Sequence, residues 1–354
     1  MIEDSWAGVD LLAAVARGVI ELASTDRSSA FRLPYPPSLQ LALDQVVAAG
    51  LMQGLPVPVG VPGMLSWCRE SALVEWPVTL PSGFLTGDAR LIHPAAGEPT
   101  RTCAELASLG REDALEQKAE ALLAGLAGAC GMVERFAVCR DFLISRPVIL
   151  RFDPVELLQP RVAQTWKLVK ELYSPVPDRF LSEGLVYRCT GCLLLAKLTT
   201  EDGPWCEGDC PLRDRVLEPS HQPEKTLVLP LALRLLLALP GRTEQAIRSQ
   251  FAEQAELIPL GLGVHRVTGD DGVPRAFQVH APEQPVPAAL RAAGTAARLA
   301  GGSLDIVVPD RLVERPGYRQ AFDRAVPADA RVRLVSVSQF TAPQPTGRPR
   351  RMHA

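Results

Sequence analysis

Hydrophobic positions recur at helical spacing through the first half of the chain, with polar residues between them. Four amphipathic helices are predicted, over residues 5–23, 38–50, 111–127 and 132–145. Residues 54–99 are dense in Pro and Gly, which predicts an irregular or short-stranded stretch anchored by Trp67 and Trp76. We therefore expect residues 1–185 to form a mainly helical domain.

A break at Pro147 divides the helical pattern near its end. Asp153-Pro154 has the pattern of an N-cap followed by a first-turn proline, so a helix is expected to restart there. Helix, short turn and helix across residues 134–172 is the order of a helix-turn-helix, and equally that of ordinary helical packing. Basic and acidic residues alternate here: Arg140, Arg146, Arg151 and Arg161 are diluted by Glu134, Asp141, Asp153 and Glu156.

The last third of the chain changes to alternating helix and strand patterns. We expect helices over 228–239, 244–255, 287–300 and 316–325, and strands around 257–260, 262–268, 275–280, 304–308 and 332–337. Helix, three strands, helix and strand is the order of a small α/β or α+β sandwich. Pro240–Thr243 is expected to cap the second of these helices. Residues 341–354 are rich in Pro, Gln and Arg, which predicts a flexible basic tail.

Four cysteines form two closely spaced pairs in the middle of the chain. Cys189 and Cys192 make a C-x2-C pair, and Cys206 and Cys210 make a C-x3-C pair. Tetrahedral zinc takes four thiolates at about 2.3 Å, and two tight turns can supply two ligands each. The pattern predicts a structural zinc ribbon over residues 186–216, with no coordination position left for a substrate. Two disulfides or four ordinary buried cysteines are the alternatives.

Two glycines lie inside these turns. We expect Gly191 and Gly208 to supply backbone with positive φ. The other cysteines lack metal-like spacing and are expected in the core: Cys68, Cys103, Cys130 and Cys139.

Composition limits the class of protein. The 354 residues are 47% hydrophobic and 22% charged, which is typical of two or three globular domains. The net charge is −3, whereas a protein that binds nucleic acid alone by releasing counter-ions is usually basic. DNA contact must therefore be local or made within a larger complex. Because no segment has the pattern of a secretion signal or a bilayer span, we expect a cytoplasmic protein without membrane contact.

Several short stretches, in the order of these parts, resemble a restriction-endonuclease-related family associated with the pPIWI-RE bacterial conflict systems. They are residues 99–107, 140–150, the four-cysteine ribbon, 240–244 and 307–310, and the resemblance covers most of residues 60–340. The family's members are encoded beside a PIWI-like protein and a DinG-type helicase. The resemblance implies a restriction-endonuclease-like domain over residues 222–340, a role in defence against invading DNA, and these two proteins as partners.

The family's nuclease core resembles the PD-(D/E)xK type, in which carboxylates hold Mg²⁺ and a lysine positions the nucleophile. Its helix glutamate is matched by Glu244. The first-strand Asp has no match, since residues 262–267 offer only His265. The acidic-x-Lys position reads Phe277-Gln278-Val279-His280, so we place its two positions at Gln278 and His280. This implies a degenerate domain that does not use Mg²⁺, with Glu244 and His280 as the remaining candidates for catalysis.

Simpler interpretations stay open for these residues. Glu244 also suits the first turn of a helix because of the helix dipole. A transition-metal site could include His265 and His280 with nearby acidic groups, although two such histidines are more often packed or surface side chains. The acidic groups concerned are Asp270, Asp271 and Glu283. Asp305 and Asp310 flank an apolar strand and are expected to be strand-end groups.

We therefore expect a non-enzymatic defence component that binds DNA, a partner nuclease or a helicase through the zinc ribbon and the degenerate nuclease-like domain. Two alternatives differ in class. One is an active metal-dependent endonuclease of the same system, with ligands such as Glu244, Asp270 and Asp271. The other is a zinc-ribbon transcription regulator that binds DNA.

Overall fold

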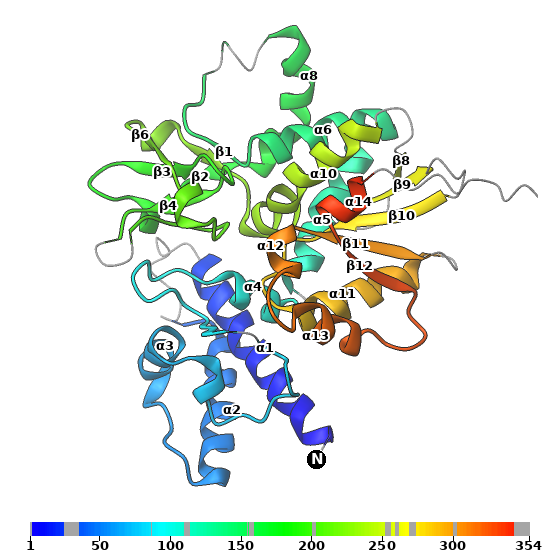
Figure 1. Cartoon of the computed structure of the whole chain (residues 1–354). Helices are drawn as coiled ribbons and strands as arrows, with labels where there is room; N and C mark the ends of the chain where they lie inside the picture. Colours follow the sequence, from blue (N-terminus) through cyan, green and yellow to red (C-terminus); the bar gives the residue numbers. More distant parts are fainter. Residues whose placement is uncertain are drawn as a thin grey trace, which may run out of the picture.

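The N-terminal helices follow the apolar spacing of the sequence in the computed structural model of the chain. The structure describes residues 2–24, 35–85, 87–109, 114–153, 155, 159–199, 203–251, 256–258, 262–268, 274–299 and 303–342. The helices of the first half are α1 (Ile2–Ser24), α2 (Pro37–Gln53), α3 (Gly60–Glu70), α4 (Arg101–Ala107), α5 (Ala114–Cys130), α6 (Val133–Ser145) and α8 (Pro160–Val169). The fold is α+β, with this helical region followed by β-sheets (Figure 1).

Two of these helices lie where no helix was predicted. α3 falls inside the Pro/Gly-rich stretch, and Trp67 on it meets Trp76 edge to face at 6.0 Å between ring centroids. Trp76 is 4% exposed, as expected of an anchor. α4 begins at Arg101, where the Thr100 hydroxyl accepts a hydrogen bond from the Cys103 N–H. Most residues of this segment have high helix propensity, and most of its side chains are buried.

The predicted helix-turn-helix differs from the structure. α6 ends at Ser145, and the connection after it runs through residues 146–153 before the next described helical residue, Val155, whose N–H donates a hydrogen bond to Asp153 Oδ1 at 2.9 Å as expected of an N-cap. Part of that connection is β1 (Val148–Ile149), which pairs with β7 (Leu227–Val228). The DNA-binding motif joins its helices by a turn of about 3–4 residues. Arg140 is 2% exposed, which excludes it from contact with DNA in this structure.

The C-terminal sheet has the predicted order of elements. Its strands are β8 (Glu256–Ile258), β9 (Val264–Thr268), β10 (Pro274–Val279), β11 (Leu304–Val308) and β12 (Val332–Ser336), arranged β12-β11-β10-β9-β8. β9 runs antiparallel to both neighbours, whereas β10, β11 and β12 are parallel. One face packs on α10 (Leu239–Phe251) and α14 (Val337–Thr341), the other on α11 (Pro285–Arg298) and α13 (Tyr318–Ala325) (Figure 1). The short helix α12 (Asp310–Val313) follows β11.

The helix before this sheet is continuous where a break and a cap were predicted. α9 (Leu231–Leu233), a π-helical turn η6 (Arg234–Ala238) and α10 follow one another without interruption. Pro240 lies in the first turn of α10 and has no backbone N–H to donate to the helix. The π-helical turn just before it shifts the pattern of backbone hydrogen bonds at this point, and the helix continues through the proline. Gly241 allows a close approach, because a Cβ there would lie 2.6 Å from the Ile144 side chain of α6. This approach places α10 against α6.

Two smaller sheets complete the fold. Residues around the cysteines form β3 (Val186–Cys189), β4 (Leu195–Lys197), β5 (Trp205–Cys206) and β6 (Leu217–Ser220), in the order β5-β4-β3-β6 with antiparallel neighbours. β7 also pairs with β2 (Ser174–Pro175), giving the order β1-β7-β2. The ribbon sheet lies beside the C-terminal helices η6 and α10 (Figure 1).

A buried ionic network joins the helical region to the C-terminal sheet. Arg101 of α4 lies 2.8 Å from the carboxylate of Glu283, just before α11. The Glu105 carboxylate accepts hydrogen bonds from the backbone N–H groups of Glu283 and Gln284 at 2.6 and 2.8 Å. Arg315 also pairs with Glu283, at 2.6 Å. The apolar core of the helical region continues into α9 and η6, so the two parts share helices. In the described ranges, no helix combines the length and the apolarity needed to cross a bilayer.

Candidate functional site

The four predicted cysteine ligands come together at one point of the ribbon. The sulfur atoms of Cys189, Cys192, Cys206 and Cys210 all lie within 4.8 Å of one another, and those of Cys189 and Cys210 are 3.9 Å apart. A tetrahedral ion with metal–sulfur bonds of about 2.3 Å places its ligands about 3.8 Å apart. All eight cysteines are free, and the separation is too long for a disulfide. The cluster could hold a metal ion such as zinc.

The two glycines in the cysteine turns act differently from the prediction. Neither Gly191 nor Gly208 has a positive φ; that conformation falls on Leu193 (φ 64°) and Asp209 (φ 47°). The glycines are needed for space, because a Cβ on Gly208 would lie 2.7 Å from the Cys192 sulfur, and one on Gly191 would lie 3.3 Å from that of Cys210. The backbone thus packs directly against the sulfur atoms, as expected of a tight metal-binding turn.

Buried charges tie the cysteine turns to the helical core. Glu207, between two of the ligands, is 6% exposed and pairs with Arg234 of η6 through both oxygens, at 2.8 and 2.5 Å. The Arg242 guanidinium donates a hydrogen bond to the carbonyl of Gly191. Two arginines of the helix that leads into the C-terminal sheet, Arg234 and Arg242, therefore bind the two cysteine turns of the ribbon.

The second candidate site centres on Glu244, which is 3% exposed on α10. Both carboxylate oxygens accept hydrogen bonds from the Arg140 guanidinium; Nη2 lies 2.6 Å from Oε2 and Nη1 reaches Oε1. His265 Nε2 lies 2.9 Å from Oε1. Burial by itself raises the pKa of Glu244, but the charge of Arg140 and the nearby His265 bring it to about 2. The carboxylate is ionised, and both of its oxygens accept hydrogen bonds from Arg140.

Gly263 makes this arrangement possible. Its φ is 111°, and a Cβ there would lie 2.1 Å from Arg140 Nη2 and 2.9 Å from Glu244 Oε2. Arg140 also donates a hydrogen bond to the Leu262 carbonyl at 3.1 Å. The sequence offered no sign of this pair, since residues 140 and 244 are far apart along the chain and Arg140 stands among other arginines.

The residues of β10 divide between the two faces of the sheet. Phe277 and Val279 pack with Ile247 of α10, on the face that carries Glu244 and His265. Because side chains alternate along a strand, Gln278 and His280 belong to the opposite face, toward α11. The assignment of the acidic-x-Lys position to Gln278 and His280 is therefore wrong: the two β10 positions beside Glu244 are apolar.

Other acidic candidates have their own partners. Asp305 pairs with Arg333 through both oxygens, at 2.9 and 2.7 Å, and Asp310 accepts a hydrogen bond from the Ser338 N–H at 3.2 Å. Glu283 lies in the arginine network described above, away from His265. Asp270 and Asp271, like the tail over 343–354, lie outside the described residues. In the parts of the chain that are described, the cysteine cluster is the one group of three or more His, Cys, Asp or Glu side chains close enough for a metal ion.

Comparison with known proteins places the first half of the chain. No curated protein and no solved structure matches the chain significantly. Residues 11–150 match the family model described as pPIWI_RE three-gene island domain Y. The matched part contains α4 and Arg140, whereas the cysteine cluster and the C-terminal sheet lie beyond it. The match associates this chain with the pPIWI-RE three-gene island systems, as the resemblance noted above implied; a relation to restriction endonucleases is not part of the match.

Proposed function

We propose that the protein is a non-catalytic component of a bacterial defence system against phages and plasmids. It binds DNA or a partner protein through a zinc ribbon over residues 186–216 and a degenerate restriction-endonuclease-like domain over residues 222–340. The order of α10, three strands, α11 and β11, with a glutamate on the first helix, supports the second assignment.

The pairing of Glu244 with Arg140 carries the proposal. Metal-dependent phosphodiester hydrolysis needs carboxylates that hold Mg²⁺ and neutralise developing charge on the phosphate. Here a fixed cation already occupies both oxygens of the one glutamate, and Phe277 and Val279 stand on the strand beside it. Arg140 supplies the positive charge that a metal ion would supply, and it already bonds both oxygens of Glu244.

The direct test is incubation of the purified protein with linear and circular DNA and Mg²⁺ or Mn²⁺. We expect no specific cleavage, alone or with the other proteins of the three-gene island added. Glu244→Gln serves as the matched control because it keeps the side-chain shape. Specific cleavage by the wild type that this variant loses would overturn the proposal in favour of an active nuclease.

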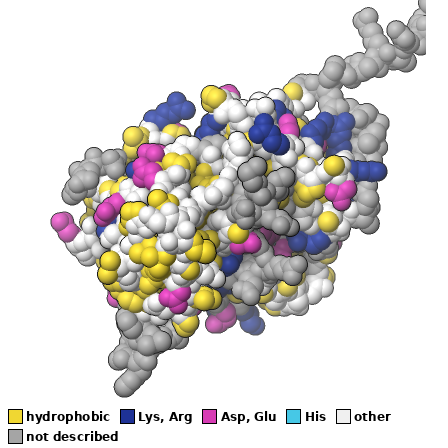
Figure 2. Space-filling view, turned by 90° about the horizontal axis from the view of Figure 1, so that it is seen from below, with side chains coloured by type: hydrophobic (Ala, Val, Ile, Leu, Met, Phe, Trp, Pro, Cys, Tyr) yellow, Lys and Arg dark blue, Asp and Glu magenta, His cyan; other side chains and the backbone are white. Residues whose placement is uncertain are grey.

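A protein partner is supported by exposed apolar side chains at the helical end of the molecule. Leu51, Met52 and Val59, at and after the C-terminal end of α2, are 65%, 82% and 90% exposed. This end faces the viewer in Figure 2, where hydrophobic side chains gather. Such exposure is typical of interaction surfaces. In co-expression with the island proteins, we expect Met52→Glu with Val59→Glu to reduce co-purification. Val138→Glu, at a 58% exposed position on α6, should not.

A further inference from the structure

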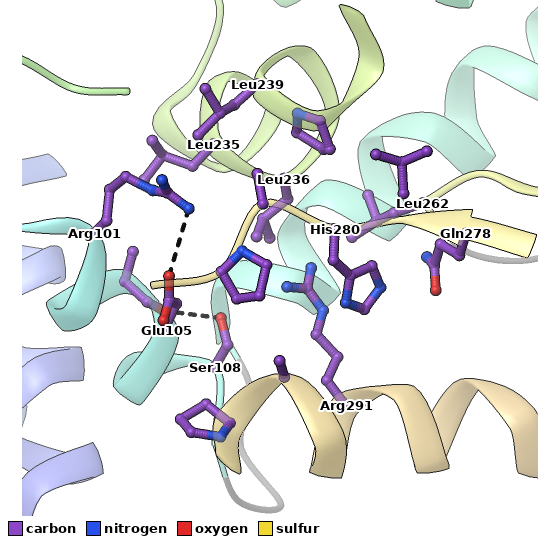
Figure 3. A pocket seen from close by; sticks show the side chains of 17 residues that line it. Arg101, Glu105, Ser108, Leu235, Leu236, Leu239, Leu262, Gln278, His280 and Arg291 are labelled. Carbon is purple, nitrogen blue, oxygen red and sulfur yellow. Dashed lines mark hydrogen bonds and ion pairs between the residues drawn. The ribbon is translucent and has the colours of Figure 1, made fainter. Parts of the chain in front are cut away.

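A pocket lies on the other face of the C-terminal sheet from Glu244, between α4, η6 and α11. Its empty volume of about 700 Å³ includes space that is open to solvent. Its walls are mainly apolar and include Leu235, Leu236, Leu239, Leu262 and Pro282. Six polar or charged side chains line the same space: Arg101, Glu105, Ser108, Gln278, His280 and Arg291 (Figure 3).

Two of these polar groups are buried without a partner in the described structure. Gln278 and His280 are each 5% exposed, and Gln278 Oε1 and His280 Nε2 make no hydrogen bond. An unpaired buried polar group costs about 1–3 kcal/mol, so native proteins rarely keep two in one cavity without a function. Arg291 lies beside His280 and pairs through Nε with Glu116 at 3.1 Å (Figure 3).

The chemistry of these groups restricts the ligand. Burial, with the nearby charge of Arg291, lowers the pKa of His280 to about 3, so its imidazole is neutral at pH 7. A neutral imidazole and a carboxamide each offer both a donor and an acceptor. A simple anion offers only acceptors and would leave the Gln278 oxygen unpaired. A planar ring with donors and acceptors along one edge matches the amide, the imidazole and the apolar walls together.

We propose that this pocket binds a nucleobase, with Gln278 and His280 recognising its hydrogen-bonding edge and Arg291 at the rim for a phosphate or carbonyl oxygen. The base can belong to a free nucleotide or to an unpaired position of a nucleic-acid strand. Because Gln278 and His280 are on the face opposite Glu244, this site is separate from the degenerate nuclease position. The proposal stands whether or not the protein cuts DNA.

Titration calorimetry on the full chain tests the proposal, with AMP, GMP, CMP and UMP as probes. A short single-stranded oligonucleotide forms a second arm, and ribose 5-phosphate and inorganic phosphate form a third. Binding of at least one nucleotide, or of the oligonucleotide, supports the site, and the tighter of the two identifies the source of the base. Equal binding of inorganic phosphate, or no binding of nucleotide and oligonucleotide, overturns the proposal.

The variant Gln278→Leu tests whether the pocket is the place where the nucleotide binds. We expect the dissociation constant to rise about tenfold or more while the melting temperature of the free protein does not fall, since an unpaired buried amide is removed. Gln320→Leu, at an exposed position of α13, is the matched control and should bind like the wild type. If Gln278→Leu does not fold, His280→Phe gives the same readout. Unchanged nucleotide affinity in a folded pocket variant would place the ligand elsewhere and contradict the inference.

Discussion

Arg140 and Glu244 form a buried pair across α6 and α10, with Nη2 2.6 Å from Oε2 and both side chains at most 3% exposed. The pair joins a residue inside the segment that matches the pPIWI_RE family model to one in the C-terminal part beyond it. Its geometry explains how the glutamate can be buried on α10: the guanidinium of Arg140 balances its charge and donates hydrogen bonds to both of its oxygens.

Removing one partner of this pair should be costly. Arg140→Met leaves the Glu244 carboxylate buried without its counter-charge, and we expect the free energy of unfolding to fall by about 3–5 kcal/mol. Adding Glu244→Leu should recover the wild-type value or exceed it, because an apolar pair of similar volume avoids the desolvation penalty. Urea denaturation of both single variants and the double variant measures the coupling.

Arg248→Ala is the matched control for that cycle. Arg248 pairs with Asp141 at 2.9 Å and lies 3.9 Å from Glu244 Oε1, but its side chain is 24% exposed. We expect a loss below about 1 kcal/mol. A similarly small loss in Arg140→Met would show that water reaches Glu244 and that the pair does not close the site.

Gly263→Ala should disturb the same site from the backbone. The new Cβ would lie 2.1 Å from Arg140 Nη2, and the φ of 111° is unfavourable for alanine. We expect a loss of about 2–4 kcal/mol, measured by urea denaturation. Gly294→Ala on α11 is the control: nothing lies within 4 Å of its Cβ position, so it should gain about 0.5–1 kcal/mol. Equal effects of the two changes would contradict the packing described here.

The cysteine cluster should bind about one metal ion per chain, and zinc is the expected ion. Cys206→Ser should abolish the bound metal and destabilise the ribbon, because metal binding and local folding are coupled. Elemental analysis of the purified protein gives the stoichiometry, and a chelator should lower the melting temperature of the wild type but not of the variant. Cys68→Ser, in a buried cysteine outside the cluster, should keep the metal. Retention of a full metal complement by Cys206→Ser would mean that the ligands are misidentified.

Local signals predicted much of this fold because they depend on near neighbours in the chain. Alternating apolar residues placed β9, β10 and β11 within a residue or two, and the paired cysteine spacings predicted the cluster. What the sequence could not supply were contacts between distant segments. The partner of Glu244 comes from α6, and strand alternation decides which β10 side chains face it. The helix through Pro240 depends on a π-turn that residue propensities do not predict.

His280 should make the protein sensitive to mild acid. Its folded pKa of about 3 lies below the unfolded value of about 6.5, so below pH 6.5 the unfolded chain binds a proton that the folded protein excludes. The stability is fully present above pH 6.5 and is lost as the pH falls toward 3. Between pH 7.5 and 5.5, the wild type should lose about 1.4 kcal/mol more unfolding free energy than His280→Phe.

Urea denaturation of both proteins at these two pH values isolates the effect of His280. Burial raises the pKa of Glu105 to about 7, so this neighbouring carboxyl favours the folded state as the pH falls, opposite in sign to His280. Glu105 is present in both proteins, so its contribution cancels in the difference between them. His221→Phe, at an exposed position, should match the wild type. Equal losses in wild type and His280→Phe would mean that the imidazole is protonated in the folded protein, which would also remove the neutral donor–acceptor edge required of the pocket.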